Sequence, residues 1–226
     1  MLKLEKVALS KDASPKKTLP KGKKKATREK IIKAAVEVFA KYPYHAASIR
    51  MICNVAEVDH PLISYYFGSK ANLFRIVITE VLEQRKQLQK TWFAEVKSMG
   101  ATRGLSLFID YILEDYRKRP GLFHIVSLNL FQADNMDTIP GYELIQEFIR
   151  VDIGGMKDNL ELRVSNSEGE MFVRAMSMLL IGFLGGGRSY AKAMNMDPDS
   201  IVYYNWVRDT VFYTLLPRLK TMVKNP

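Results

Sequence analysis

The residues best suited to chemistry lie in a short segment near residues 60–70. Imidazole, alcohol and phenol groups occur there at His60, Ser64, Tyr65 and Tyr66. These groups donate and accept hydrogen bonds while staying mostly uncharged near pH 7. Displayed together on one short helix, they suit the edges of bases and the phosphates of a nucleic acid. The segment therefore indicates nucleic-acid binding.

The motifs of common enzyme active sites are absent from the sequence. It contains no His-Glu-x-x-His and no Gly-x-Ser-x-Gly, and its three histidines and single cysteine form no zinc-ligand cluster. The Gly185-Gly186-Gly187 run lacks the Lys-Ser/Thr and the preceding strand of a phosphate-binding loop, and more simply predicts a loosened or kinked helix. We therefore expect no enzyme activity, no cofactor and no metal site.

Two amphipathic helices are predicted on either side of the polar segment. Apolar residues recur at helical spacing over residues 27–42, where Thr27 is a suitable N-cap and Pro43 ends the pattern. A longer apolar stripe runs through residues 70–99, with Ser69 as a suitable N-cap. These helices can hold the polar segment on a rigid frame.

Between them, the pattern predicts a helix-turn-helix. Ser48 can cap a helix over residues 49–56, and His60-Pro61 can open a second helix that Gly68 ends. The connecting turn is short, and Cys53 is small enough for two helices to cross closely. A helix-turn-helix places its second helix in the major groove of DNA. We expect Cys53 itself to be inert packing, because a buried apolar thiol is a poor nucleophile.

The same stretch carries a specific set of motifs. They are Ile31-Ile32-x-Ala34-Ala35-x-x-x-Phe39, Ser48-Ile49-Arg50-x-Ile52, Val58, and Tyr65-Tyr66-Phe67-Gly68-Ser69-Lys70-x-x-Leu73-Phe74. With them, residues 27–75 resemble the N-terminal domain of the tetracycline-repressor (TetR) family of bacterial transcriptional regulators. The family usually has glycine where this chain has Glu57 and a small residue where it has Pro61. Glu57 must then accept a turn geometry that glycine takes more easily.

The resemblance implies roles for individual residues of the head. Positions that usually face base edges are occupied by Arg50, His60, Pro61 and Leu62. Positions that usually hold phosphates are occupied by Ser48, Ser64, Tyr65, Tyr66 and Lys70, with Tyr66 favoured over Tyr65. Arginine can pair with guanine and leucine can touch a thymine methyl. Each position also has a structural interpretation, since Ser48 can be only an N-cap and the tyrosines can be partly core.

The remainder of the chain reads as helices separated by proline and glycine. The predicted helices cover residues 102–119, 122–132, 139–162, 167–194 and 198–223, and no alternating strand pattern or internal repeat is evident. We predict an all-α protein with three parts: a disordered Lys-rich arm over residues 1–26, the DNA-binding domain over 27–75, and a larger helical ligand-binding and dimerisation domain over 76–226.

Charge is concentrated in the predicted arm. The 226-residue chain has a net charge of +10, and residues 1–26 contribute nine lysines against two acidic residues, a net charge of +7. Such an arm can strengthen DNA binding electrostatically, or it can be an inert solvated tail. The single cysteine, the absence of a signal peptide and the short apolar run at residues 175–187 predict a soluble, cytoplasmic, nucleoid-associated protein without a membrane partner.

The resemblance also implies an effector pocket and a homodimer. Candidate pocket residues are aromatic, apolar or hydroxyl side chains that could equally be ordinary core: Trp92, Phe93, Phe108, Tyr111, Ile112, Tyr116, Phe123, Ser127, Phe131 and Met176. Few polar groups lie among them, so we expect a small apolar or aromatic effector. Candidate interface residues come from the last two long helices, which could instead complete the monomer core: Phe172, Leu179, Gly182, Phe183, Gly186, Tyr204, Val207, Val211, Phe212 and Leu215.

These expectations combine into one functional hypothesis. The chain is expected to be a homodimeric transcription factor that binds a palindromic double-stranded operator, most simply a repressor that a small effector releases. The alternative is a basic architectural DNA-binding protein without an effector or sequence preference. A short palindromic footprint would favour the former, and diffuse protection the latter.

Overall fold

The computed structural model describes residues 21–132 and 137–224, and nearly all of them are helical or in short turns. The elements are α1 (Lys21–Lys41), α2 (Ile49–Ala56), α3 (His60–Phe67), α4 (Lys70–Val96), α5 (Gly100–Lys118), α6 (Gly121–Leu130), α7 (Tyr142–Asn159), α8 (Asn166–Leu180), the π-helix η2 (Ile181–Gly185), α9 (Gly187–Ala193) and α10 (Ile201–Met222). Extended pairing within these residues is limited to one isolated bridge between Leu162 and Val223. The all-α prediction is confirmed.

Local capping explains why several helices begin where the sequence predicts. Ser48 accepts a hydrogen bond from the Met51 amide, and Ser69 accepts one from the Asn72 amide. Each bond satisfies a backbone donor that has no partner inside the helix. As a result, α2 occupies its predicted residues and α4 starts at the predicted position, although α4 ends at Val96, before residue 99.

The first helix starts earlier than predicted. It begins at Lys21, so residues 21–26 belong to α1 and not to the predicted arm. Lysine is a good helix former, and the periodic apolar pattern that fixed the predicted start only marks where burial begins. Residues 1–20 of the predicted arm lie outside the described residues.

One predicted helix is broken. The segment predicted as continuous over residues 167–194 contains η2. The part formed by α8 and η2, Asn166–Gly185, meets α9, Gly187–Ala193, at 75°. The predicted kink at the glycine run is thus confirmed. A β-carbon on Gly185 would lie 2.4 Å from the Ser127 β-carbon, so this glycine allows α6 to approach the bent backbone.

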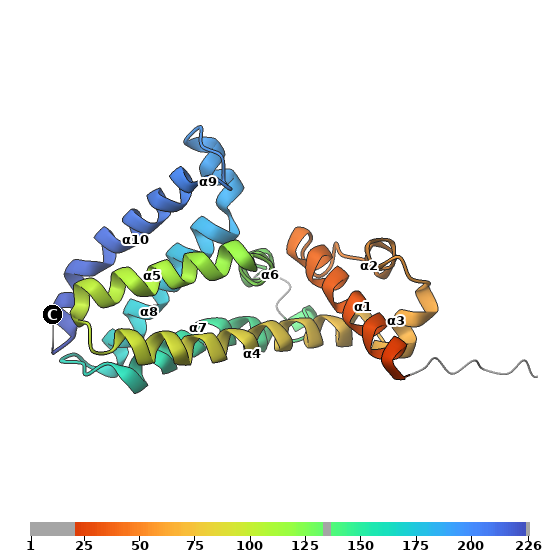
Figure 1. The fold of residues 1–226 in the computed structure, drawn as a ribbon, viewed down its shortest axis with the longest axis horizontal. Coiled ribbons are helices and arrows are strands. Elements are labelled where there is room, and N and C mark those ends of the chain that lie inside the picture. The colour runs from red at the N-terminus through yellow and green to blue at the C-terminus, as the bar shows by residue number, and fades with distance from the viewer. Residues whose placement is uncertain (1–20, 133–136, 225–226) are drawn as a thin grey trace, which may run out of the picture.

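The fold consists of a head and a larger helical body (Figure 1). Helices α1, α2 and α3 form the head around a core that includes Ile31, Phe39, Ile52 and Ile63. The long helix α4 leaves the head and runs the length of the body, where it packs along α7, while α5 packs along α10 (Figure 1). Helix α6 packs against α1, and Thr138 forms a hydrogen bond with His45, so the body touches the head at points other than α4.

No single helix in the described part of the chain is long and apolar enough to cross a membrane. The pair Asn166–Gly185 and Gly187–Ala193 meets that test only jointly, across its bend, and only by length and composition.

Candidate nucleic-acid interface and ligand pocket

The turn between α2 and α3 has the geometry that the helix-turn-helix pattern requires. Glu57 adopts left-handed backbone angles (φ 47°, ψ 51°), as expected for a residue that stands where glycine is usual. Its carboxylate lies 2.9 Å from the Lys30 ammonium, and this contact lowers the pKa of Glu57. Cys53 is buried against the neighbouring helices, and burial raises the pKa of its thiol. The small contact residue is therefore a packing residue, as predicted.

The predicted base-contacting residues are brought to one end of the head. Arg50, His60 and Pro61 are exposed, whereas Leu62 is half-buried against the core. Helix α3 lies at the end of the molecule farthest from the tip of α10 and the C-terminus (Figure 1). Nothing in the described residues covers this face, so it is open to a partner as large as a DNA duplex.

The exposure of the two tyrosines of α3 does not match the sequence-based preference for Tyr66 over Tyr65 as a phosphate contact. Tyr65 is 63% exposed, with the Lys24 ammonium 5.9 Å from its ring centroid. The Tyr66 ring is half-buried, and its hydroxyl is buried without a hydrogen-bond partner among the described residues. Tyr65 is thus the more accessible of the two, although both phosphate-contact assignments remain predictions.

Lys70 has a structural role that the sequence does not reveal. Its ammonium donates hydrogen bonds to the carbonyls of Tyr44 and Ala47, each at 2.9 Å, and lies 4.2 Å from the Tyr44 ring centroid. Partial burial lowers the pKa of Lys70. Two of its three donors therefore tie the loop before α2 to the start of α4, and one donor remains for a phosphate. Ser48 and Ser64 are exposed, and Ser48 also caps α2.

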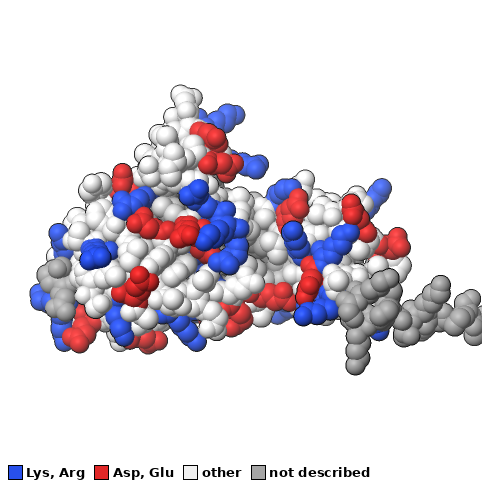
Figure 2. All heavy atoms as spheres, in the orientation of Figure 1, with Lys and Arg blue, Asp and Glu red and all other residues white. Residues whose placement is uncertain are grey.

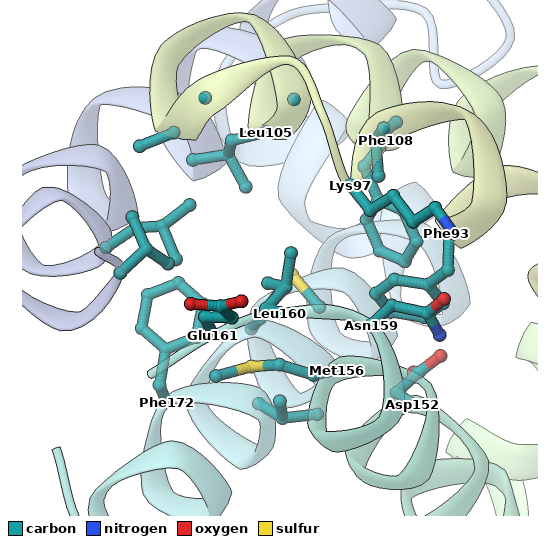
Figure 3. Close-up of a pocket in the computed structure, with 18 residues that line it drawn as sticks. Phe93, Lys97, Leu105, Phe108, Asp152, Met156, Asn159, Leu160, Glu161 and Phe172 are labelled. Atoms are coloured by element: carbon teal, nitrogen blue, oxygen red, sulfur yellow. The ribbon is translucent and has the colours of Figure 1, made fainter. Parts of the chain in front are cut away.

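A pocket opens in the body between α4, α5, α7, α8 and the end of α10 (Figure 3). Its volume is about 220 Å³, and most of its lining side chains are apolar. Three predicted pocket residues line it, namely Phe93, Phe108 and Met176. Phe172, which was predicted at the dimer interface, also lines it.

The other predicted pocket residues lie outside this cavity. Ile112, Phe123 and Tyr116 are buried core, and Trp92 stacks on Tyr111 with ring centroids 5.9 Å apart. Ser127 lies beside the bent backbone at Gly185, and Phe131 is 68% exposed. Helical periodicity identifies a buried face but does not say which buried face borders a void.

A buried polar cluster beside the pocket was missed. Arg85 on α4 pairs with Asp152 on α7 at 3.5 Å, and Ser177 on α8 donates to the same carboxylate at 3.4 Å. Burial raises the pKa of Asp152, and Arg85 partly offsets that effect. A signal was present in the sequence, since Arg85 and Gln89 fall in register with the apolar stripe of α4. Burial of a polar side chain costs free energy unless the side chain is paired, so polar residues on a buried stripe indicate a polar cluster.

Comparison with known proteins identifies the head. The sequence profile of the family described as "Bacterial regulatory proteins, tetR family" matches residues 31–77. The HTH-type transcriptional repressor NicS of Pseudomonas putida is 38% identical over 108 residues, which make up 47% of this chain and 50% of NicS. Residues 31–77 thus match the DNA-binding head of the TetR family.

Longer alignments extend the similarity through the body of the chain. The probable HTH-type transcriptional regulator YttP of Bacillus subtilis is 23% identical over 194 residues, 85% of this chain and 89% of YttP. The crystal structure of the regulator FadR from Bacillus subtilis shares the fold, with 20% identity, a TM-score of 0.55, and coverage of 84% of this chain and 97% of FadR. In its helix-turn-helix head and over most of its length, the chain is therefore similar to DNA-binding transcriptional regulators.

The predicted dimer-interface residues fall into two groups. Phe172, Tyr204, Val207, Val211 and Leu215 are buried within the subunit, so their assignment to an interface is corrected. Leu179, Gly182, Phe183, Gly186 and Phe212 are partly exposed. Helix α10 packs on α5 and α8, so only its outer face is free. That face carries Val202, Trp206 and Tyr213.

Helix α6 links the body of the chain to its head. The Asn129 side chain accepts a hydrogen bond from the Tyr44 amide at 2.9 Å, in a buried position. His124 forms a hydrogen bond with the Ala40 backbone and lies 3.0 Å from the Tyr116 hydroxyl, which also donates to the Leu184 carbonyl in η2. A chain of polar contacts thus connects the end of α1 with the π-helix.

Proposed function

We propose that this protein is a homodimeric repressor of the TetR family, that it binds a palindromic operator, and that a small molecule in the body pocket releases it. The observation that carries the proposal is the presence, in one chain, of an open α2–α3 face and a separate apolar cavity joined by α4. Helix α4 starts at Lys70, which is anchored to the head, and reaches the cavity through Phe93 and Val96. The name of NicS, a repressor, supports the sign of regulation.

Dimerisation is required by the size of the reading element. Helix α3 has eight residues and can contact only a few base pairs, so a second head is needed for a specific site. The outer faces of α8 and α10 carry apolar side chains exposed to solvent in the monomer, among them Met171, Val202 and Tyr213, at 60%, 59% and 71%. Much of the arm formed by α9 and α10 is uncharged in Figure 2. These faces support a two-fold interface between copies.

The cavity supports a compact effector. Its volume of about 220 Å³ is below the roughly 300–1,000 Å³ of typical drug-sized sites. FadR from Bacillus subtilis has been solved with stearoyl-CoA, a far larger molecule. The pocket of this chain would have to open considerably for such a ligand, so we favour a small one with an apolar body. Operator binding would place the protein on cytoplasmic DNA.

The proposed mechanism is a shift in the spacing of the two heads. A ligand that prefers a spacing mismatched to one turn of DNA lowers operator affinity by its differential affinity for the two states. Motion at the cavity can reach the head through α4, and through α6 by way of His124 and Asn129. A ligand that binds both spacings equally would have no effect.

Selection of DNA fragments by the purified full-length chain, followed by footprinting, tests the proposal. We expect a short palindromic protected site, and His60→Ala should relax base preference at one position in each half-site. Diffuse protection would instead indicate an architectural protein, and absence of protection would contradict DNA binding altogether. A logo unchanged by His60→Ala would remove His60 from the base-reading set.

A further inference from the structure

The inner wall of the pocket carries one buried charge. Asp152, Lys97 and Glu161 are the charged residues that line the cavity, and Lys97 and Glu161 are exposed at its rim. Asp152 is 1% exposed, and Figure 3 places it beside Asn159 and below the Phe93 ring. A ligand that fills the cavity therefore meets a carboxylate at its inner end.

The Asp152 carboxylate is held loosely by the protein. The Arg85 guanidinium lies 3.5 Å away and the Ser177 hydroxyl 3.4 Å away. Charge-assisted hydrogen bonds are normally about 2.7–2.9 Å long. The carboxylate also has lone pairs beyond those two contacts. It can accept a shorter hydrogen bond from a ligand without losing either protein partner.

The compensating positive charge is kept away from the cavity. Arg85 does not line the pocket, and its guanidinium is packed among the rings of Trp92, Phe123 and Phe148, with centroids 5.2–5.4 Å away. Its other acidic neighbour is Asp115, at 3.8 Å. The negative member of the pair is thus the one that borders the cavity. This arrangement favours a donor or a cation in the pocket and disfavours an anion.

A second observation concerns the hydrogen bonding of the cluster. Among the described residues, Nε and Nη1 of Arg85 are buried without a hydrogen-bond partner. The same holds for both amide atoms of Gln89, which lies one turn after Arg85 on the buried stripe of α4. Buried polar groups are almost always paired, so the hydrogen bonding along this stripe is incomplete.

The remaining lining sets the shape of the occupant. Phe93, Phe108 and Phe172 supply aromatic walls, and Met156 and Met176 supply adaptable ones. Aromatic walls also attract cations through their ring faces. We propose that the effector is a compact cationic amine with an apolar body, whose ammonium group donates to the Asp152 carboxylate. This inference rests on the proposed function, because it names the ligand class of the same pocket.

Calorimetric titration of the full-length protein with two probes of similar shape and opposite charge tests the proposal. The probes are 2-phenylethylamine and 3-phenylpropanoate. We expect the amine to bind at least about tenfold more tightly than the carboxylate. Burial raises the pKa of Asp152, so amine affinity should rise with pH while the amine remains protonated. Equal or tighter binding of the carboxylate, or no binding of the amine, would overturn the proposal.

Two variants locate the contact. Asp152→Asn should reduce amine affinity about tenfold or more and abolish its pH dependence, because the isosteric amide cannot carry the charge. Glu161→Gln is the matched control, since it removes an exposed carboxylate from the rim and should change affinity by less than about twofold. Amine binding unaffected by Asp152→Asn would refute the assignment. If Asp152→Asn does not fold, the comparison of the two probes on the unaltered protein decides the matter.

The outcome is separable from that of the proposed function. Footprinting without any probe tests operator binding alone, so a palindromic footprint with no amine binding rejects only the ligand class. Amine binding without any footprint supports the ligand class and rejects the regulator.

Discussion

At the scale of single residues, the head combines groups that face outward with groups that hold its own frame. Arg50 and His60 are exposed, so both are accessible to DNA. The Lys70 ammonium, by contrast, donates hydrogen bonds to the carbonyls of Tyr44 and Ala47. Lys70, whose motif predicts a phosphate contact, thus also holds the loop before α2 against the start of α4.

Replacement of Lys70 by alanine should therefore reduce stability as well as DNA affinity. Two buried or half-buried carbonyls would lose a charged donor, and we expect a loss of about 1–3 kcal/mol in the free energy of unfolding measured with urea. Lys33→Ala, at an exposed position of α1, is the matched control and should be near neutral. If Lys70 also contacts a phosphate, the slope of log DNA affinity against log salt concentration should become shallower by the contribution of about one phosphate contact. Unchanged stability would contradict the structural role.

His124 gives the stability of the protein a pH dependence with a defined sign. Burial, followed by the charge of Arg188, lowers the pKa of His124 below its ordinary value of 6.5. The unfolded chain therefore binds more protons than the folded one between that lowered pKa and 6.5. This contribution to stability is present above the ordinary value and is lost as pH falls. Urea unfolding of the His124→Gln variant should show a weaker loss from about pH 8 to about pH 5.5 than the parent chain; identical profiles would count against His124.

At the scale of elements, the helix ends that depend on neighbouring residues could be predicted from the sequence. Ser48 and Ser69 define helix starts by hydrogen bonds to backbone amides three residues on, and Pro61 fits the first turn of α3, where a missing N–H breaks no helical bond, so these ends were predictable. The start of α1 was not, because lysines continue the helix without any apolar periodicity. The bend after α8 was foreseeable from its glycines, but its form was not. It depends on the Tyr203 and Tyr116 hydroxyls, which bind the Phe183 and Leu184 carbonyls.

The bend should be sensitive to side-chain volume at one glycine. A β-carbon on Gly185 would lie 2.4 Å from the Ser127 β-carbon and 2.8 Å from the Phe123 carbonyl oxygen. Gly185→Ala should therefore destabilise the protein by about 1–3 kcal/mol through overpacking. Gly154→Ala is the control, because nothing lies within 4 Å of its β-carbon position and helix propensity should stabilise by about 0.5–1 kcal/mol. Equal melting temperatures for the two variants would show that α6 does not press on η2.

At the scale of the whole molecule, the head could be predicted in detail and the pocket only in part. The head is compact in sequence, and its motifs specify which residues face outward. The pocket gathers side chains from five helices, so Asp152 and Met156 enter it only once α7 is placed beside α4 and α8. The interface prediction included core residues such as Val207 and Val211, since periodicity alone cannot separate the buried side of a helix from its exposed apolar side.

Disruption of the outer α8–α10 face should separate dimerisation from folding. Tyr213→Glu places a charge on an apolar position that is 71% exposed in the monomer, so the subunit should fold normally. Burial of that charge in a two-fold interface is unfavourable, and sedimentation should show a monomer with operator affinity reduced at least about tenfold. Phe131→Glu, a charge at another exposed aromatic, is the matched control and should remain dimeric. A dimeric Tyr213→Glu protein would move the interface elsewhere.

The central claim is that two α3 helices, related by two-fold symmetry, enter successive major grooves of one operator. The most direct measurement inserts about five base pairs, half a turn of DNA, between the half-sites of the selected operator. The two half-sites then lie on opposite faces of the duplex, and the dimer can hold only one of them. The account predicts a fall in affinity of at least about tenfold that a further insertion of about five base pairs partly restores. Unchanged affinity with the half-turn insertion would contradict it.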